Sequence, residues 1–317
     1  MTDKGESGVE TIESFEKTDD YGTLALRNGV AAAFFFDRPP ERIAQQIVAA
    51  LDAFVTAVPA KELRYAVTSA SAGQFKPFGP GTIAACRKQL NPAGVKKREL
   101  SAVLVGSEGK DAPRYRFEFT GQRSDEEMPQ AGSVLDMTFP IESLAPGRIQ
   151  ALVTFLFGLS ELLDYSSGYC GPALLRKGTV LGSVDRKELR GLAVRHPGYD
   201  VADNKSSANL IGGLARGAHW ITWLGPALTG RLGGEAALQR ALGDSILVQA
   251  STKGLTIRAG EYPELGDVNR KRDTPLLRRV ARVLEPVTHF DDQFSPMYQL
   301  FGDKEFLAEW ERRFLRP

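Results

Sequence analysis

The stretch from residue 211 to residue 242 constrains the fold more than any other part of the chain. Two of the three tryptophans, Trp220 and Trp223, lie in its middle. From Leu214 to Ile221, apolar and polar residues alternate, which is the period of a half-buried strand. Because a buried tryptophan is usually a packing residue, we expect this strand to end in the core. His219 is then expected to be a hydrogen-bonded core or rim residue.

After the tryptophans the period becomes helical. Three leucines four residues apart share one helical face: Leu224, Leu228 and Leu232. Proline is tolerated in the first turn of a helix, so Pro226 predicts a start near Gly225. The glycine pair at 233–234 provides the end, and a second short helix is expected at 235–242. The stretch therefore predicts a strand that runs directly into helices.

The composition is that of an ordinary globular protein. The chain has 317 residues, of which 42% are hydrophobic and 25% are charged, enough to bury a full core. A formal net charge of +1 gives no indication of a nonspecific nucleic-acid or membrane surface. The two cysteines, Cys86 and Cys170, are far apart and predict neither a disulfide framework nor a thiolate metal site.

The first 21 residues are acidic and polar and lack an apolar period, so we expect a disordered tail at 1–21. Residues 22–317 are then expected to form a single domain. The tail has no basic region followed by an apolar one, and so is not a secretory signal. The most apolar long run, 149–163, is too short to span a membrane. These features predict a soluble cytoplasmic protein.

Two segments repeat the order of a strand followed by a helix. Val30–Phe36 is an apolar run of strand length, and a helical stripe from Ile43 to Val55 follows Pro40. A strand expected at 134–139 likewise precedes an apolar helix at 149–164. The helices open with the similar phrases PERI and PGRI, which reflect either an internal duplication or a chance match.

The remaining elements complete the predicted fold. Other strands are expected at 63–67, 100–105 and 115–119, with a hairpin at 246–259. Other helices are expected at 185–193, 276–284 and 306–314. Residues 167–171 are expected to form a turn. Hairpins and the scarcity of regular βαβ repeats predict an α+β fold with a mixed, mostly antiparallel sheet packed with helices.

Catalytic signatures are absent from the sequence. The glycines at 225 and 230 are not followed by Lys and Ser or Thr, so there is no phosphate loop, and neither a G-x-S-x-G nor an H-E-x-x-H motif occurs. We therefore expect no enzyme activity, no catalytic residue and no cofactor. One cluster, His289 with Asp291 and Asp292, has the residue types of a metal site, but a polar surface loop is the more common meaning.

Several phrases taken in order resemble a known family. They span 167–171, 195–200, 217–225, 258–267 and 310–314. Together they are similar to the TsiV-type immunity family of the bacterial type VI secretion system, over about residues 25 to 315. The chain departs from the similar phrase at His219, where a small polar residue is expected.

The resemblance implies an immunity protein. Such a protein binds and neutralises a cognate antibacterial toxin, often a nuclease, by stoichiometric inhibition. The partner implied is a toxin encoded by the adjacent gene, with no nucleic-acid or membrane partner. The absence of a secretory signal agrees with a toxin that acts in the cytoplasm. The family supplies no catalytic or contact residues to carry over.

Residues 288–303 are our candidate for the toxin-binding surface. Aromatic residues anchor interfaces, and acidic ones suit the basic groove of a nuclease. The candidate contact residues are Phe290, Asp291, Asp292, Phe294 and Tyr298. The alternative is that these aromatic side chains only fix the terminal helix to the rest of the protein.

A different class of function is suggested by the loop at 259–273. It is rich in glycine, proline and charge, as in Gly260, Pro263, Gly266 and Asp267. Such a loop suits the lid of a small-ligand or enzyme site, and it equally suits a structural turn. The neighbouring gene separates the two functions, because a secretion-associated toxin gene favours immunity and a metabolic operon favours a ligand.

Overall fold

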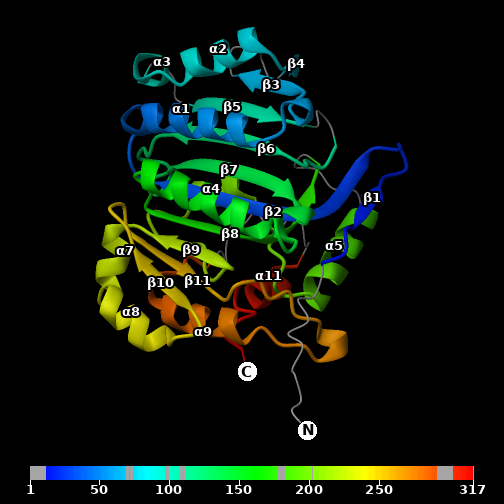
Figure 1. Ribbon diagram of the computed structural model, residues 1–317, viewed down its shortest axis with the longest axis vertical. Helices are drawn as coiled ribbons and strands as arrows, with labels where there is room; N and C mark the ends of the chain where they lie inside the picture. The colour runs from blue at the N-terminus through cyan, green and yellow to red at the C-terminus, as the bar shows by residue number, and fades with distance from the viewer. Residues whose placement is uncertain are drawn as a thin grey trace.

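The computed structural model describes residues 12–68, 71, 74–96, 100–107, 111–177, 183–201, 203–290 and 303–316. Its centre is an eleven-stranded sheet, and every pairing between named strands is antiparallel. Helices α1 (Pro40–Ala57) and α4 (Ile149–Leu162) lie across one face of this sheet (Figure 1). The predicted α+β class is confirmed.

The strand order along the sheet is β10-β11-β9-β8-β2-β7-β6-β5-β3-β4, and β1 pairs with β2. In chain order the strands are β1 (Glu16–Thr18), β2 (Leu24–Phe36), β3 (Tyr65–Thr68), β4 (Lys76–Pro77), β5 (Leu100–Gly106), β6 (Arg116–Gln122), β7 (Ser133–Pro140), β8 (Ser167–Arg176), β9 (Ile221–Leu224), β10 (Leu247–Ala250) and β11 (Leu255–Arg258). The other helices are α2 (Pro80–Gln89), α3 (Pro92–Lys96), α5 (Ser183–Arg195), α6 (Asn204–Ala208), α7 (Pro226–Arg231), α8 (Glu235–Leu242), α9 (Pro275–Leu284) and α11 (Lys304–Glu311).

Strand β2 is the central strand of the fold. It pairs with β7 on one side and with β8 on the other, and both of its faces are buried. Phe34 and Phe36 point into the large core beneath α1 and α4, whereas Phe35 packs with Ala31 and Ala33 in a separate cluster on the opposite face. Burial on both faces explains why this segment is a continuous apolar run rather than an alternating one.

Helix α1 has the apolar stripe that the sequence predicts. Ile43, Ile47, Leu51 and Phe54 are all fully buried in the large core, and the helix begins at Pro40. Helix α4 covers the same face of the sheet and contacts α1. The two strand-then-helix units therefore lie side by side, and their origin by duplication stays a prediction.

The strands β9, β11 and β10 extend the sheet and carry a second core. Their buried residues pack with those of α7, α8 and α9. The helix predicted to start near Gly225 and end at 233–234 is confirmed as α7, and the helix predicted at 235–242 and the hairpin predicted at 246–259 are confirmed as well. Trp223 joins the two regions, because its ring lies 4.9 Å from that of Phe34 in the large core.

The turn predicted at 167–171 is wrong, because these residues begin the fully buried strand β8. Glycine occurs there for packing rather than for turning. A Cβ atom at Gly168 would lie 2.8 Å from the carbonyl oxygen of Ala33 and from the ring of Phe34. The neighbouring strand therefore leaves no room for a side chain at this position.

The strand predicted from Leu214 to Ile221 is also wrong, since β9 begins only at Ile221. The preceding residues form a loop, in which Gly217 has a φ of +111° that other residues rarely adopt. Arg216 and His219, although an odd number of residues apart, both turn from this loop into one buried polar cluster, which a strand does not allow.

Part of the predicted acidic tail differs from the expectation of disorder. Residues 16–18 form β1, which pairs with β2. The side chain of Asn28 fixes the segment before it, since Oδ1 accepts from the Phe15 N–H at 2.8 Å and Nδ2 donates to Glu13 O at 2.7 Å. A buried asparagine must be hydrogen-bonded, and this segment supplies its partners. The division into a tail at 1–21 and one domain at 22–317 stays a prediction.

The apolar helix α4 is only 14 residues long. Within the described ranges, the chain has no helix whose length and apolar content would let it cross a membrane.

Replacing Trp220 by alanine should destabilise the whole fold. The side chain is 1% exposed, and its Nε1–H donates to Gly260 O at 3.2 Å. We expect Trp220→Ala to lower the free energy of unfolding by about 3–5 kcal/mol in denaturant titrations. Tyr21→Ala is the control, because Tyr21 is 92% exposed and should change that free energy by less than about 0.5 kcal/mol. Equal stability of Trp220→Ala and wild type would contradict the core placement.

Candidate functional site

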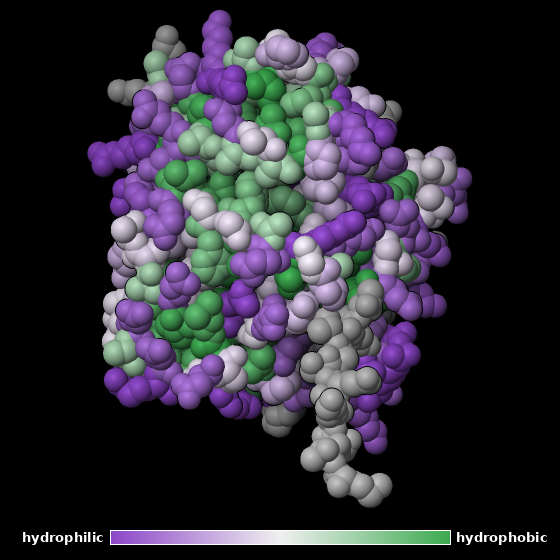
Figure 2. All heavy atoms as spheres, viewed as in Figure 1, coloured by the Kyte–Doolittle hydropathy of each residue, from purple (hydrophilic) through white to green (hydrophobic). Residues whose placement is uncertain are grey.

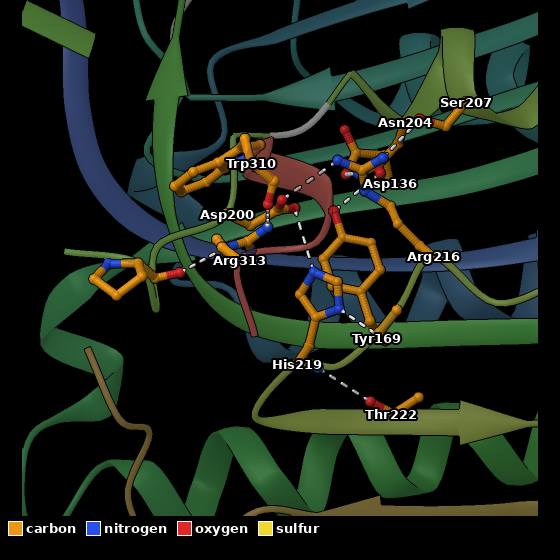
Figure 3. A network of polar contacts seen from close by, with 12 residues as sticks. Asp136, Tyr169, Asp200, Asn204, Ser207, Arg216, His219, Thr222, Trp310 and Arg313 are labelled. Atoms are coloured by element: carbon orange, nitrogen blue, oxygen red, sulfur yellow. Dashed lines mark hydrogen bonds and ion pairs between the residues drawn. The ribbon is translucent and has the colours of Figure 1, made fainter. Parts of the chain in front are cut away.

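Three polar side chains meet at the face of β8 that lies opposite α1 and α4. The side chains of Asp200, Arg216 and His219 are only 3%, 8% and 7% exposed. Asp200 is fixed to β8, because its N–H donates to Pro172 O and its carbonyl accepts from the Leu174 N–H. Arg216 and His219 come from the loop that precedes β9, and Figure 3 shows both directed toward Asp200.

Asp200, Arg216 and His219 are held by ion-pair, hydrogen-bond and ring-stacking contacts. Arg216 Nη2 lies 3.4 Å from Asp200 Oδ1, and Arg216 Nη1 donates to Ser207 Oγ at 2.9 Å. His219 Nε2 lies 3.7 Å from Asp200 Oδ2, which is longer than a hydrogen bond. The His219 ring stacks on Tyr169 with centroids 3.9 Å apart. Arg216 therefore makes the closest charged contact of Asp200.

A series of polar contacts extends from Tyr169, which stacks on His219, across the sheet to Arg116 on β6. Tyr169 Oη donates to Asn204 Oδ1 at 2.9 Å, and Asn204 Nδ2 donates to Asp136 Oδ1 at 3.0 Å. Asp136 in turn pairs with Arg116 at 3.0 Å. Four segments distant in sequence are thus linked on one sheet face through polar contacts.

The C-terminal turn closes the cluster from the other side. Arg313 Nε donates to Pro197 O at 2.8 Å, and Nη1 donates to Trp310 O at 3.0 Å. Its guanidinium lies over the Trp310 ring at 3.9 Å and over the Phe314 ring at 4.5 Å. Figure 3 shows Arg313 beside Asp200. These contacts attach the end of the chain to the loop that positions Asp200.

Burial and charge pairing set the protonation of these groups. Burial is the largest single effect on the pKa of Asp200 and acts to raise it, but Arg216, His219 and Arg313 together outweigh burial and hold the pKa well below its ordinary value. Burial lowers the pKa of His219, and Asp200 opposes that shift without reversing it. Burial also lowers the pKa of Arg313 to about 10, which leaves it charged at neutral pH. At neutral pH the cluster therefore holds paired charges beside a neutral imidazole.

Asp136 at the far end of the network behaves differently from Asp200. Burial raises its pKa to about 6, and the opposing charge of Arg116 offsets only part of that effect. Glu118, its cross-strand neighbour, adds a like charge that raises the pKa further. Asp136 is therefore the more weakly compensated of the two buried carboxylates.

A small open cavity adjoins the cluster. Its lining includes Asp200, Arg216, His219, Phe290 and Arg313. The space available to the centres of water-sized molecules is about 30 Å³, room for about two waters. This volume is too small for a metabolite, which needs a pocket of roughly 300 Å³ or more.

Of the predicted contact segment at 288–303, only residues 288–290 and 303 lie in the described part of the chain. Phe290 is half-buried beside the small cavity, and the Arg312 guanidinium lies 4.3 Å from its ring centroid. The other candidates lie outside the described residues: Asp291, Asp292, Phe294 and Tyr298. Their assignment to a contact surface stays a prediction.

The metal hypothesis gains no support from the described residues. The backbone N–H of His289 donates to Ala215 O at 2.8 Å, which fixes this residue to the loop before β9. Its two predicted partners at 291 and 292 are not described. Within the described ranges, no group of three or more His, Cys, Asp or Glu side chains is arranged to hold a metal ion.

The loop at 259–273 is built largely by turn chemistry. Asp267 accepts a hydrogen bond from the Arg270 N–H, begins the 3₁₀ turn Val268–Arg270, and pairs with Arg195 at 3.0 Å. His196 Nδ1 lies 2.8 Å from Gly266 O. A second cavity of about 310 Å³ lies between this loop, α5 and the segment before β1. Its lining includes Phe15, Asn28, Tyr199 and Leu265.

Comparison with protein families assigns the chain. The model of the TsiV family, described as type VI immunity for VRR-NUC, matches residues 46–314. The chain belongs to the TsiV family. The match begins within α1, after strands β1 and β2, and includes Asp200, Arg216 and His219. The family resemblance expected from the sequence is confirmed.

A solved structure supports the fold of this TsiV member. The Pseudomonas aeruginosa T6SS protein PA0821 superimposes with a TM-score of 0.76 at 18% sequence identity, covering 95% of this chain and 87% of that chain. At this identity the similarity establishes a shared fold. A comparison with curated proteins finds no match.

Sequence reasoning missed the centre of this TsiV site. It identified His219 but not Asp200 or Arg216. The available signal was a lone arginine within an otherwise weakly polar stretch before Trp220. Asp200, the partner of Arg216, lies 16 residues earlier, and this spacing matches neither a helical nor a strand period that would predict a contact. Only the attachment of Asp200 to β8 brings the pair together.

Replacing Asp200 should destabilise the protein in a pH-dependent manner. Asp200→Asn leaves Arg216 buried without a counter-charge, which costs about 3–5 kcal/mol at pH 7. Because the folded pKa of Asp200 is lowered, its contribution is present above the ordinary value of 3.8 and is lost as pH falls below it. The stability difference from wild type should therefore narrow toward acid in denaturant titrations from pH 7 to pH 3.

Glu126→Gln is the matched control, because Glu126 lies exposed in the turn between β6 and β7. It should change stability by less than about 0.5 kcal/mol at every pH. A difference between Asp200→Asn and wild type that stays constant across this pH range would contradict the role of the ionised carboxylate.

Proposed function

We propose that this chain is the immunity partner of a VRR-NUC-type nuclease and neutralises it by forming a stoichiometric complex in the cytoplasm. The observation that carries the proposal is the family match over residues 46–314, whose description names VRR-NUC. The adjacent gene is the expected source of the nuclease. Inhibition by binding requires no chemistry from the immunity protein itself.

The buried cluster supports a binding protein rather than an enzyme. His219 is the only histidine in it, and burial, which lowers its pKa, together with its stacking on Tyr169 makes it a poor proton-transfer group. Its backbone N–H lies 3.3 Å from Thr222 Oγ1, but its ring faces Asp200 rather than a nucleophile. These features suit a rigid support for a surface and make turnover unnecessary to the proposal.

Phe290 and the residues that follow it form the proposed contact surface. Phe290 lines the same small cavity as Arg313, and Arg313 is held by its hydrogen bond to Pro197 O. The segment therefore starts from a fixed point. Its acidic and aromatic residues would face the basic nucleic-acid groove of a nuclease. A fixed starting point at Phe290 lowers the entropic cost of binding.

A second candidate function rests on the cavity beneath the loop at 259–273. Its volume of about 310 Å³ reaches the range of small-ligand pockets. This candidate predicts a metabolic gene as neighbour, whereas the immunity proposal predicts a secretion-associated nuclease gene. The family match favours the immunity proposal.

The complex with the nuclease should be tight. One free nuclease molecule acts many times, so protection needs a long residence time. We expect a one-to-one complex with a sub-nanomolar Kd, which corresponds to more than about 12 kcal/mol. Isothermal calorimetry with a catalytically inactive nuclease measures both values. A micromolar Kd, or nuclease activity that survives equimolar immunity protein, would count against sequestration.

Charge reversal at residues 291 and 292 should change association without unfolding the protein. Exposed charges contribute little to stability, so Asp291→Lys with Asp292→Lys should keep the wild-type melting temperature. Acids that face a basic groove accelerate encounter, so the double variant should associate at least tenfold more slowly at low salt, with a flattened or inverted salt dependence.

Stopped-flow association at low and high salt measures this effect. The matched control is Glu126→Lys with Glu127→Lys, which places the same charge change on the exposed turn between β6 and β7. Equal association rates for wild type and the 291–292 variant at both salt concentrations would remove this segment from the interface.

A further inference from the structure

The two edges of the central sheet differ in how they are protected from pairing with a further strand. The edge strand β4 is two residues long and consists of Lys76 and Pro77, which are residue types that prevent edge pairing. The opposite edge strand is β10, with the sequence LVQA. It contains no charge and no proline, and so lacks these protections.

The hydrogen-bond pattern fixes which groups of β10 face outward. The Ser251 N–H donates to Gly254 O at the hairpin, so this pair and every second pair along β10 and β11 are the bonded ones. Leu247 and Gln249 therefore bond to β11. Val248 and Ala250 alternate with Leu247 and Gln249, and the N–H and C=O groups of Val248 and Ala250 point away from β11.

An independent contact supports this pattern. The Ala259 N–H donates to Trp220 O on the other side of β11, so Ile257 and Leu255 bond to β9 and not to β10. Their β10 partners, Val248 and Ala250, are thus the outward ones. Within the described residues, these outward groups accept and donate no hydrogen bond, which leaves two N–H and two C=O groups at the edge.

The side chains around this edge also suit a protein contact. Leu247 is 43% exposed, and Gln249 and Ala250 are exposed. Figure 2 shows apolar side chains gathered at the lower left, in the region of β10 and β11. An exposed apolar edge strand is a template for pairing with another strand.

We propose that two copies of this chain pair through β10, edge to edge and antiparallel, about a twofold axis at Gln249. In this register Val248 of one copy lies opposite Ala250 of the other. The twofold axis makes Ala250 of the first copy and Val248 of the second an identical pair. All four outward groups of each copy are then hydrogen-bonded. Because the whole sheet is antiparallel, the pairing continues it without a change of direction.

A second copy fits this edge better than an unrelated strand does. An isologous contact needs a self-complementary surface, and a strand with outward groups at two positions symmetric about a central residue provides one. The strand has no charge that would repel its own copy. This inference goes beyond the proposed immunity function and uses neither Phe290 nor the segment after it.

Sedimentation equilibrium over a concentration series tests the proposal. The wild type should show a mass approaching twice the 34.6 kDa of one chain. Ala250→Pro removes an outward N–H that β11 does not use, and Gln249→Lys places two ammonium groups at the twofold axis. Each variant should raise the dimer dissociation constant at least tenfold while it keeps the wild-type melting temperature.

Leu162→Lys is the control. Leu162 is 43% exposed, and it lies on α4, outside the proposed interface at β10. It should dimerise as the wild type does. Amide hydrogen exchange tests the proposal on the wild-type protein, so the result does not depend on whether a variant folds. In wild type, the Val248 and Ala250 amides should become protected as concentration rises, whereas the Leu247 and Gln249 amides should be protected at every concentration.

Three results would overturn the proposal. They are a wild type that stays monomeric to about 100 µM, a dimer that both folded variants leave intact, and exchange at Val248 and Ala250 that does not depend on concentration. Protection of these amides only after addition of the nuclease would assign the edge to the nuclease and would equally contradict self-pairing.

Discussion

The buried ion pair between Arg216 and Asp200 is the contact on which the arrangement of the site depends. Asp200 is attached to β8 through its backbone, and Arg216 belongs to the loop before β9. Arg216 also donates to Ser207 of α6, and Arg313 fixes the C-terminal turn beside the pair. Because a buried charge without its partner costs several kcal/mol, these segments must take up their positions together. The pair therefore constrains the loop before β9, whose Ala215 O accepts from the His289 N–H next to Phe290.

The sequence predicts best those elements whose burial follows a period. Helix α1 begins at Pro40 and shows a complete apolar stripe, and the hairpin from β10 to β11 alternates around a turn. Strand β8 could not be predicted in this way. Its serine and glycine residues are turn formers in isolation, and only the close approach of Phe34 explains why a side chain is excluded at Gly168. Local composition thus fails where packing between strands decides the residue.

The site is harder to predict than the fold for a related reason. The loop around Gly217 shows an alternating pattern, but its polar members turn inward to partners that are distant in sequence. Neither the pairing of Arg216 with Asp200 nor the link from Tyr169 through Asn204 to Asp136 has a local spacing that could reveal it. Phe290 was identified because it begins a run of aromatic and acidic residues, and its place beside the Arg313 cluster agrees with either an interface or a structural role. The interface role of Phe290 stays a prediction.

Hydrogen exchange of the chain alone and in complex with the nuclease tests the central claim most directly. If the protein neutralises its partner through the segment that begins at Phe290, residues 288–303 and the adjoining turn at 311–315 should become the most strongly protected part of the surface. The loop at 259–273 should exchange as in the free protein. Protection confined to that loop, with unchanged exchange at 288–303, would contradict the account.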